Sequence, residues 1–222
     1  DGLTDHTVND MLEDADGNLW IATNKGLSKF DRTTQTFTAY HDIPSDTVSL
    51  YRDRINSLLL TDDHYLWLGT GGGLVRFDTK NDSMTGFLST PQEYFSTRSN
   101  YILDICEGNY NNLLIGTTYG LIDFNKENGR STRYYHVPGD SSGLSNDNVR
   151  CIYRESSGNI WIGTRNGLNY YDPTTASVKH YYFDPEDPKS VGANYIRTIY
   201  EDSRGNIWIG TFLGGLNKYN PA

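Results

Sequence analysis

Eight side chains in the middle and C-terminal parts of the chain supply the groups that sugar recognition requires. Planar rings pack on the apolar faces of sugars, whereas guanidinium and amide groups hydrogen-bond their hydroxyls. The residues are Tyr101, Tyr119, Arg150, Arg165, Asn166, Tyr195, Arg197 and Phe212. If the ligand carries a uronate or sulfate group, Arg150, Arg165 and Arg197 are its natural partners, because their forked donors match carboxylates and sulfates. The alternative is a solvated rim whose polar groups bond one another.

These candidate residues vary within a framework that repeats every 47 residues. One large apolar column and one threonine column run through the whole chain without a gap: Trp20, Trp67, Leu114, Trp161 and Trp208, and Thr23, Thr70, Thr117, Thr164 and Thr211. A Gly-Leu pair and then an aromatic residue follow each copy, as at Gly26-Leu27 and Phe30. The repeats span approximately residues 6–52, 53–99, 100–146, 147–193 and 194–222. We expect them to form one continuous segment, residues 1–222.

Each repeat predicts four short antiparallel strands. In the first repeat these are the alternating run 8–13, the tryptophan phrase 18–23, the run 26–30 and an outer strand at 37–40. Tight turns such as Asp16-Gly17 connect them, because glycine accepts the positive φ of a hairpin turn. Four strands repeated at this period are typical of a β-propeller, whose blades stack around a central channel. The fold class expected is therefore all-β.

The last repeat ends soon after its third strand and lacks an outer strand. We therefore expect the five repeats to be part of a seven-bladed ring. A five-bladed ring closed without an exchanged strand, and closure through another chain, remain open alternatives. An open piece would expose the edge and face of its last blade, which favours oligomerisation.

The side-chain pattern also predicts the core. Alternation along residues 8–13 places Val8 and Asp10 on one face of the first strand and Met11 on the other, with both faces against neighbouring blades. One apolar column is thereby expected to be buried: Met11, Leu58, Ile105, Ile152 and Ile199. The tryptophan and aromatic columns are expected to pack between blades.

Composition excludes several classes of function. The chain has 19 Lys and Arg against 28 Asp and Glu, a net charge of -9, which disfavours nucleic acid as a partner. No apolar stretch approaches the roughly 18 residues of a spanning helix, so no membrane contact is expected within this segment. The histidines do not follow the repeat or show ligand spacing, and Asp14–Asn18 departs from the calcium-loop pattern. We predict no metal site and no cofactor.

Carboxylates are the other side chains in the sequence that could act as catalytic groups. Asp10 and Asp104 occupy the same position of the first strand in repeats one and three. A glycosidase would need two carboxyls about 5 to 9.5 Å apart, with the pKa of one raised. The other repeats have Ser57, Cys151 and Thr198 there, so the sequence offers no such pairing. The prediction is that the chain is not an enzyme, with a propeller glycosidase as the less favoured alternative.

The phrase Glu201–Thr211 resembles the two-component regulator propeller repeat, and so does Glu13–Thr23. The shared pattern is Asp-x-x-Gly-Asn-Ile/Leu-Trp-Ile-Gly-Thr with a Gly-Leu pair downstream. The third copy departs from it, with Leu114 in place of tryptophan and Tyr110-Asn111-Asn112 at the turn. The resemblance covers essentially the whole chain.

This resemblance implies a sensor function. Propellers of this kind form the extracytoplasmic, periplasmic sensor region of hybrid two-component histidine kinases that recognise oligosaccharides of complex glycans. By that resemblance the chain is expected to bind an oligosaccharide without catalysing a reaction. An assembly propeller that binds other proteins or forms homo-oligomers is the alternative.

Overall fold

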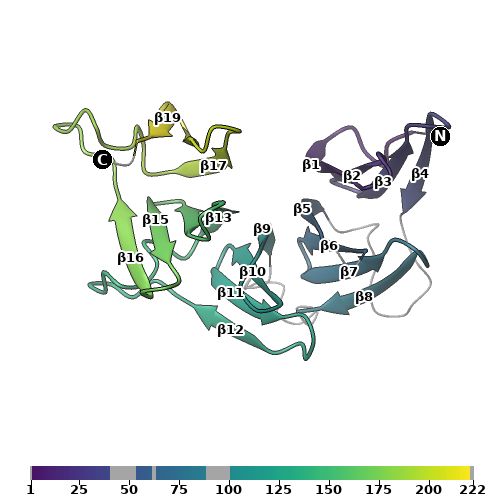
Figure 1. The fold of residues 1–222 in the computed structure, drawn as a ribbon, viewed down its shortest axis with the longest axis horizontal. Helices are drawn as coiled ribbons and strands as arrows, with labels where there is room; N and C mark the ends of the chain where they lie inside the picture. The colour runs from purple at the N-terminus through teal and green to yellow at the C-terminus, as the bar shows by residue number, and fades with distance from the viewer. Residues whose placement is uncertain (1, 41–53, 62–63, 89–100, 221–222) are drawn as a thin grey trace. The chain divides into compact units, whose positions relative to one another are not determined.

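The computed structural model describes residues 2–40, 54–61, 64–88 and 101–220. Its strands form antiparallel sheets, which we call blades one to five in chain order (Figure 1). Blade one contains β1 (Val8–Glu13), β2 (Leu19–Thr23), β3 (Gly26–Asp31) and β4 (Thr36–Tyr40). Blade two contains β5 (Ile55–Leu60), β6 (Tyr65–Thr70), β7 (Leu74–Asp78) and β8 (Ser83–Phe87). Blade three contains β9 (Ile102–Glu107), β10 (Asn112–Thr117), β11 (Gly120–Asn125) and β12 (Ser131–Tyr134). Blade four contains β13 (Val149–Arg154), β14 (Ile160–Thr164), β15 (Gly167–Asp172) and β16 (Ser177–Tyr181). Blade five contains β17 (Ile196–Glu201), β18 (Ile207–Thr211) and β19 (Gly215–Tyr219).

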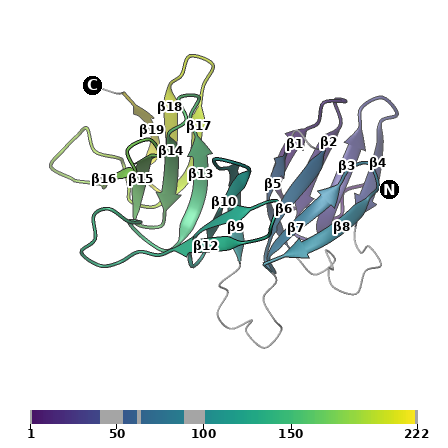
Figure 2. The ribbon, with the colours of Figure 1, turned by 60° about the horizontal axis from the view of Figure 1, so that its bottom comes forward.

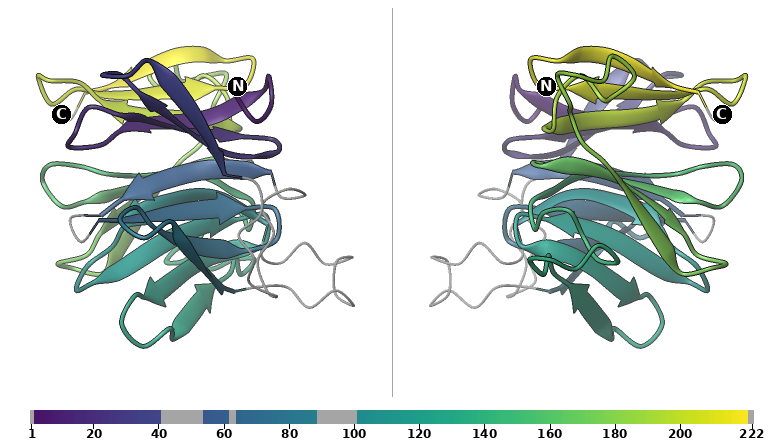
Figure 3. Two further views of the ribbon diagram at one scale, coloured as in Figure 1. Left: turned by 90° about the vertical axis from the view of Figure 1, so that its right-hand side faces the viewer. Right: turned by 90° about the vertical axis from the view of Figure 1, so that its left-hand side faces the viewer.

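Strands that follow one another in the chain pair within each blade, as in order β13-β14-β15-β16. Figure 2 shows these strands side by side, and Figure 3 shows the twist of the sheets. The prediction of an all-β fold of β-propeller blades is confirmed, and blade five has three strands among the described residues. The chain divides into two compact units, residues 1–105 and 106–222, with the boundary inside β9. Each unit is described by itself below.

A β-bulge shapes the first strand of the blades. In blade four Val149 pairs with Thr164 and Cys151 with Gly163, so Arg150 is the extra residue between two ladder positions. The bulge breaks the alternation of side chains. Val149 and Ile152 consequently face the same neighbour, because a Cβ added to Gly116 would come within 2.8 and 3.4 Å of them. The expectation that these two positions face opposite sides is therefore wrong.

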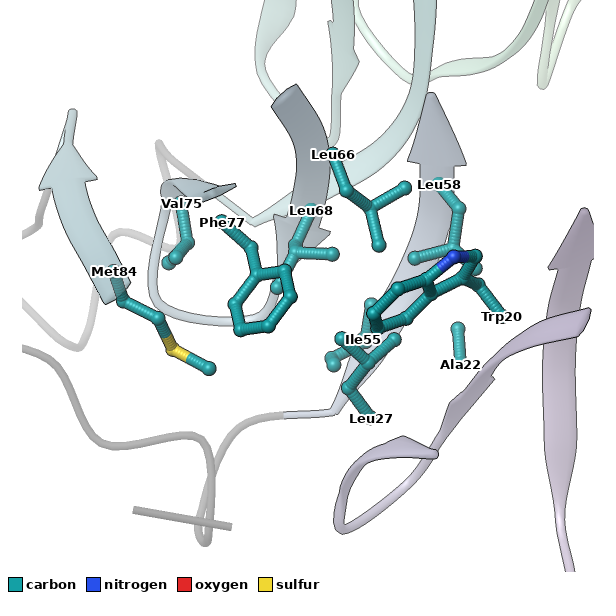
Figure 4. Packing of buried hydrophobic residues seen from close by; sticks show 10 residues of the cluster. All are labelled: Trp20, Ala22, Leu27, Ile55, Leu58, Leu66, Leu68, Val75, Phe77 and Met84. Carbon is teal, nitrogen blue, oxygen red and sulfur yellow. The ribbon is translucent and has the colours of Figure 1, made fainter. Parts of the chain in front are cut away.

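Tryptophan rings fill the space between successive blades, as the sequence predicts. Trp20 is 1% exposed, and its ring lies 5.4 Å from that of Phe77 in the next blade, edge to face. Figure 4 shows this ring among Leu27 of its own blade and Leu58 of blade two. Trp161 makes the same contact with Tyr219, at 4.9 Å. The burial of such rings supplies much of the packing energy of the fold.

One member of the predicted apolar column is not buried. Leu58, Ile105, Ile152 and Ile199 are each at most 8% exposed, whereas Met11 is 55% exposed. The expectation for Met11 is wrong, because within the described residues of 1–105 blade two covers only the other face of blade one.

Carboxylates at the turn between the first two strands anchor the tryptophans. In three of the four tryptophans the indole N–H donates to an acidic side chain six residues earlier, in the pairs Trp20–Asp14, Trp161–Glu155 and Trp208–Asp202. Hydrogen bonds from the Trp208 indole, and then from Asn206, hold the pKa of Asp202 well below its usual value. The packing of Trp208 is thus coupled to the ionisation of Asp202.

This coupling predicts a pH dependence. A carboxyl with a lowered folded-state pKa stabilises the fold above its unfolded value of about 4 and loses that contribution as the pH falls. In Asp202→Asn the amide oxygen still accepts the indole N–H but does not titrate. We expect its melting temperature to fall less than that of the wild type between about pH 6 and about pH 3. Thermal denaturation followed by circular dichroism measures this.

The control is Glu186→Gln, which removes an exposed carboxyl from the connector after β16. The melting temperature of Glu186→Gln should fall by as much as that of the wild type over the same pH range. Equal losses for the wild type and Asp202→Asn would show that this carboxylate does not govern acid stability.

Candidate functional site

The turn between the second and third strands of each blade is closed by the same threonine hydrogen bond in all five repeats. The threonine hydroxyl that ends the second strand donates to the carbonyl of the glycine that begins the third, as Thr164 does to Gly167 at 2.8 Å. In the first four repeats the threonine hydroxyl also accepts from the backbone N–H two residues on, as from Asn166 at 3.1 Å. The φ of Gly167 is +114°, a conformation that favours glycine. The repeated Thr and Gly-Leu positions therefore build a hydrogen-bonded turn whose central residues vary, two in the first four repeats and three in blade five.

These turns are tied to the residues that lead into the first strand of their own blade. In blade five the N–H of Phe212 donates to the carbonyl of Tyr195 at 2.8 Å, and in blade four Arg165 N–H donates to Asn148 at 3.0 Å. Asn24 and Thr7 form the same bond in blade one. Variable residues from two segments of each repeat are thus held at one end of the blade.

The connectors between blades three, four and five are clamped to this end as well. The Asn194 side chain accepts from Phe183 N–H at 2.7 Å, and its carbonyl accepts from Gly167 N–H at 2.7 Å. Asp147, 47 residues earlier, makes the equivalent bonds to His136 and Gly120, both 2.6 Å long. The residues that follow Asp147 and Asn194 therefore begin their strands in a fixed position.

Four of the eight predicted ligand residues come together on this scaffold, and we call them the arginine–aromatic cluster: Arg150, Tyr195, Arg197 and Phe212. The guanidinium carbons of Arg150 and Arg197 both lie 5.6 Å from the centre of the Tyr195 ring. Arg197 also donates to the Tyr195 hydroxyl at 3.3 Å, and the Phe212 ring lies 5.4 Å from that of Tyr195. Strands β13 and β17, which carry the arginines, lie side by side in the unit 106–222 (Figure 2).

The β-bulge explains why both arginines reach one ring. Arg150 is the extra residue of β13, and Arg197 lies in the corresponding register shift of β17, between Ile196 and Thr198. Each side chain thereby leaves the regular alternation that would bury it between blades. Neither guanidinium forms an ion pair with a described residue. The cluster offers two guanidinium groups, the half-buried Tyr195 ring and the exposed Phe212 ring to an anionic ligand with a flat face.

The other four predicted ligand residues do not belong to the arginine–aromatic cluster. Tyr101 belongs to the unit 1–105, where it lies beside Gly71. Tyr119 is 50% exposed and packs edge to face on Tyr135, with ring centres 5.3 Å apart. Arg165 and Asn166 are exposed at the turn of blade four.

Sequence reasoning missed two neighbours of Tyr119. Arg133 donates to the carbonyl of Tyr119 at 2.8 Å and to the hydroxyl of Thr117 at 3.1 Å, which locks the turn of blade three. Tyr135 supplies the ring on which Tyr119 packs. Arg133 lies in the outer strand β12, and Tyr135 directly follows this strand. A basic residue and an aromatic residue two positions apart at the end of the outer strand are the sequence signal that could have identified them.

The two carboxylates considered for catalysis are engaged with backbone. Asp10 accepts from Leu58 N–H at 2.7 Å and from Met11 N–H at 2.8 Å, and burial raises the pKa of this carboxyl. Asp104 accepts from the Ser57 hydroxyl at 3.0 Å and from its neighbour Ile105 at 2.9 Å. These bonds join successive blades of the unit 1–105, which is a structural role.

Two further features of the described residues bear on function. No group of three or more His, Cys, Asp or Glu side chains within 2–40, 54–61, 64–88 and 101–220 is placed to hold a metal ion. The same residues contain no helix that is long and apolar enough to cross a membrane.

Comparison with solved structures gives the same fold. The chain is similar to the extracellular domain of the hybrid two component system BT4673 from B. thetaiotaomicron, at 23% identity and a TM-score of 0.79, covering 97% of this chain and 27% of that one. It is also similar to the extracellular domain of the hybrid two component system BT3049 from the same organism, at 26% identity and a TM-score of 0.76, covering 98% and 29%. The chain thus spans less than a third of either relative.

A more distant likeness is to virginiamycin B lyase from Staphylococcus aureus, at 13% identity and a TM-score of 0.65, covering 96% of this chain and 69% of that one. No curated protein sequence matches the chain. The extracellular domains among the similar structures agree with the extracytoplasmic location that the sequence resemblance implies.

The sequence model of the two component regulator propeller family matches residues 2–25, 143–166 and 190–212. Each match covers the residues that lead into the first strand, the first and second strands of the blade, and the start of the turn that follows, and it ends before the glycine of that turn. Within these three segments the chain therefore matches two component regulator propeller repeats.

Proposed function

We propose that this chain is part of the extracytoplasmic sensor of a hybrid two-component regulator and binds an anionic oligosaccharide without catalysis. The single observation that carries the ligand proposal is the arginine–aromatic cluster, in which two guanidiniums without an ion-pair partner among the described residues share the Tyr195 ring. The likeness to sensor domains at 26% identity supports the sensor part of the proposal.

The chemistry of the cluster favours a sulfated or uronate-containing sugar. A guanidinium binds a carboxylate or sulfate through two parallel N–H bonds, which a neutral sugar hydroxyl does not match. The half-exposed Phe212 ring offers a face for a sugar ring beside these donors. Two strand bulges and a hydrogen-bonded turn carry the four side chains, so the backbone of the site is already ordered before binding.

The non-catalytic part of the proposal is supported by the engagement of Asp10 and Asp104 with backbone N–H groups. A general acid or base needs an oxygen that can reach the substrate proton. The likeness to a lyase at 13% identity concerns the fold alone.

Isothermal titration calorimetry with matched oligosaccharides tests the proposal. Sulfated or uronate-containing oligosaccharides should bind, and their desulfated or carboxyl-reduced forms should bind at least about tenfold more weakly. The dissociation constant should rise with salt for the anionic series. Binding of neutral and anionic forms with equal affinity, or of neither, would contradict the ligand proposal.

A second candidate function is protein assembly, favoured by exposed apolar side chains on blade five. Tyr200, Leu213 and Leu216 are 61%, 91% and 68% exposed. Apolar surface of this kind is a common interaction site. Light scattering coupled to size-exclusion chromatography would distinguish a monomer from a homo-oligomer, and substitution of Leu216 by aspartate should dissociate an oligomer that uses this surface.

A further inference from the structure

A pocket of about 410 Å³ lies between blades three and four of the unit 106–222, and we call it the inter-blade pocket. Its apolar wall comes from both blades and from the connector that joins them: Leu114, Leu121, Leu144, Ile160, Ile162 and Tyr171. Its volume falls in the range of small-molecule sites.

The pocket occupies the space that an indole ring fills one blade further along the chain. The wall residues have counterparts at the next repeat that surround the buried Trp161: Leu168, Val191, Ile207, Ile209 and Tyr219. The position equivalent to Trp161 in blade three is Leu114, which is too short to fill the same space. A side chain smaller than the framework around it leaves a void that the walls close only in part.

Two other departures of blade three accompany the missing tryptophan. The residue that accepts the indole N–H in blades four and five, Glu155 or Asp202, is replaced by Gly108. The residue that places a cation over the tryptophan ring in blades one, two and five, as Lys29 does over Trp20 at 5.2 Å, is replaced by Asp123, whereas blade four has Tyr170 there. The ring, its acceptor and its cation are therefore all missing, and a carboxylate lines the pocket instead.

This carboxylate is held in place by a chain of hydrogen bonds. The Asn125 amide donates to the Asn112 carbonyl oxygen at 2.8 Å, and the Asn112 amide donates to Asp123 Oδ1 at 2.7 Å. Asp123 forms no ion pair with a described residue. Tyr134, 48% exposed, and Tyr110, 96% exposed, are at the mouth of the pocket, so a ligand can enter from solvent.

From these observations we propose that the inter-blade pocket binds a small organic cation that carries a planar aromatic ring. The ring takes the place of the absent indole between the apolar walls, and the ammonium group pairs with the Asp123 carboxylate. Such a ligand would supply in one molecule the ring and the cation that blades one, two and five supply as side chains. The site is separate from the arginine–aromatic cluster and does not depend on glycan binding.

Tryptamine is a suitable probe, because it combines an indole ring with an ammonium group. Calorimetry should show saturable tryptamine binding to the wild-type chain. Indole-3-propionate, with the same ring and the opposite charge, should bind at least about tenfold more weakly. Tryptamine should also raise the melting temperature, because it binds only the folded state.

Two variants and one control locate the site. Leu114→Trp restores the ring found in four repeats and should abolish tryptamine binding, whereas Asp123→Asn should weaken it at least about tenfold. Glu186→Gln removes an exposed carboxyl outside the pocket and should leave it unchanged. Circular dichroism checks that each variant is folded, and the two pocket variants test the proposal independently.

The proposal is overturned if tryptamine does not bind the wild-type chain, or if indole-3-propionate binds equally well. It is also overturned if folded Leu114→Trp and Asp123→Asn both bind tryptamine as the wild type does. A failure of the glycan titrations alone leaves these outcomes unaffected.

Discussion

Replacement of Trp161 by alanine should lower the free energy of unfolding of the chain by about 3–5 kcal/mol. The side chain is fully buried, and three rings surround it: Tyr170 at 4.5 Å, Tyr219 at 4.9 Å and Tyr181 at 5.7 Å. Alanine would leave a cavity between blades four and five and remove the N–H that Glu155 accepts. The loss combines the transfer of apolar surface with an incompletely closed void.

The matched control is Trp208→Ala, which changes the same residue type at the same position of the next repeat. Trp208 also donates to a carboxylate, but its ring is partly exposed. Its replacement should therefore cost about half as much or less. Urea unfolding followed by far-ultraviolet circular dichroism gives both values by linear extrapolation. Equal losses at the two positions would contradict the assignment of Trp161 to the inter-blade core.

The repeat made most of the blade structure predictable. A 47-residue period with an invariant threonine and a Gly-Leu pair sets the second strand, the turn and the third strand, because the threonine hydroxyl and the positive φ of glycine act locally. Whether a strand face is buried depends on whether a second blade packs against it, and this is decided by the assembled blades and not by the strand itself. Alternation along a single strand therefore could not show that Met11 would be 55% exposed.

Only part of the candidate site could be predicted from the sequence, and that part depended on the positions that vary between repeats. Position within the repeat identified the variable residues, and four of them meet at Tyr195. The β-bulge at Arg150 changes the face of the sheet toward which the following side chains point. Strand β13 contains no glycine or turn residue from which this bulge could have been predicted. The inter-blade pocket arises from three separate positions, including Leu114 and Asp123, whose joint effect needs the packed structure.

Loss of both cluster arginines should reduce the affinity for an anionic oligosaccharide by at least about 100-fold, since a hydrogen bond to a charged group contributes about 1.5–3 kcal/mol. Arg150 and Arg197 flank the same ring, so one sulfate or carboxylate can contact both. Each single alanine variant should lose at least about tenfold. Lysine at either position keeps the charge but not the fork, and should restore only part of the affinity.

Calorimetry at two salt concentrations measures these effects. Arg204→Ala, at an exposed turn on the opposite end of blade five, is the matched control and should bind as the wild type does. Arg165→Ala tests whether the third predicted arginine belongs to the site, and its exposed position apart from Tyr195 predicts a smaller loss than Arg197→Ala. The salt dependence of binding should decrease in the double variant, because fewer charges are neutralised in the complex. Unchanged affinity in the double variant would exclude the arginine–aromatic cluster as the glycan site, whatever the oligosaccharide bound.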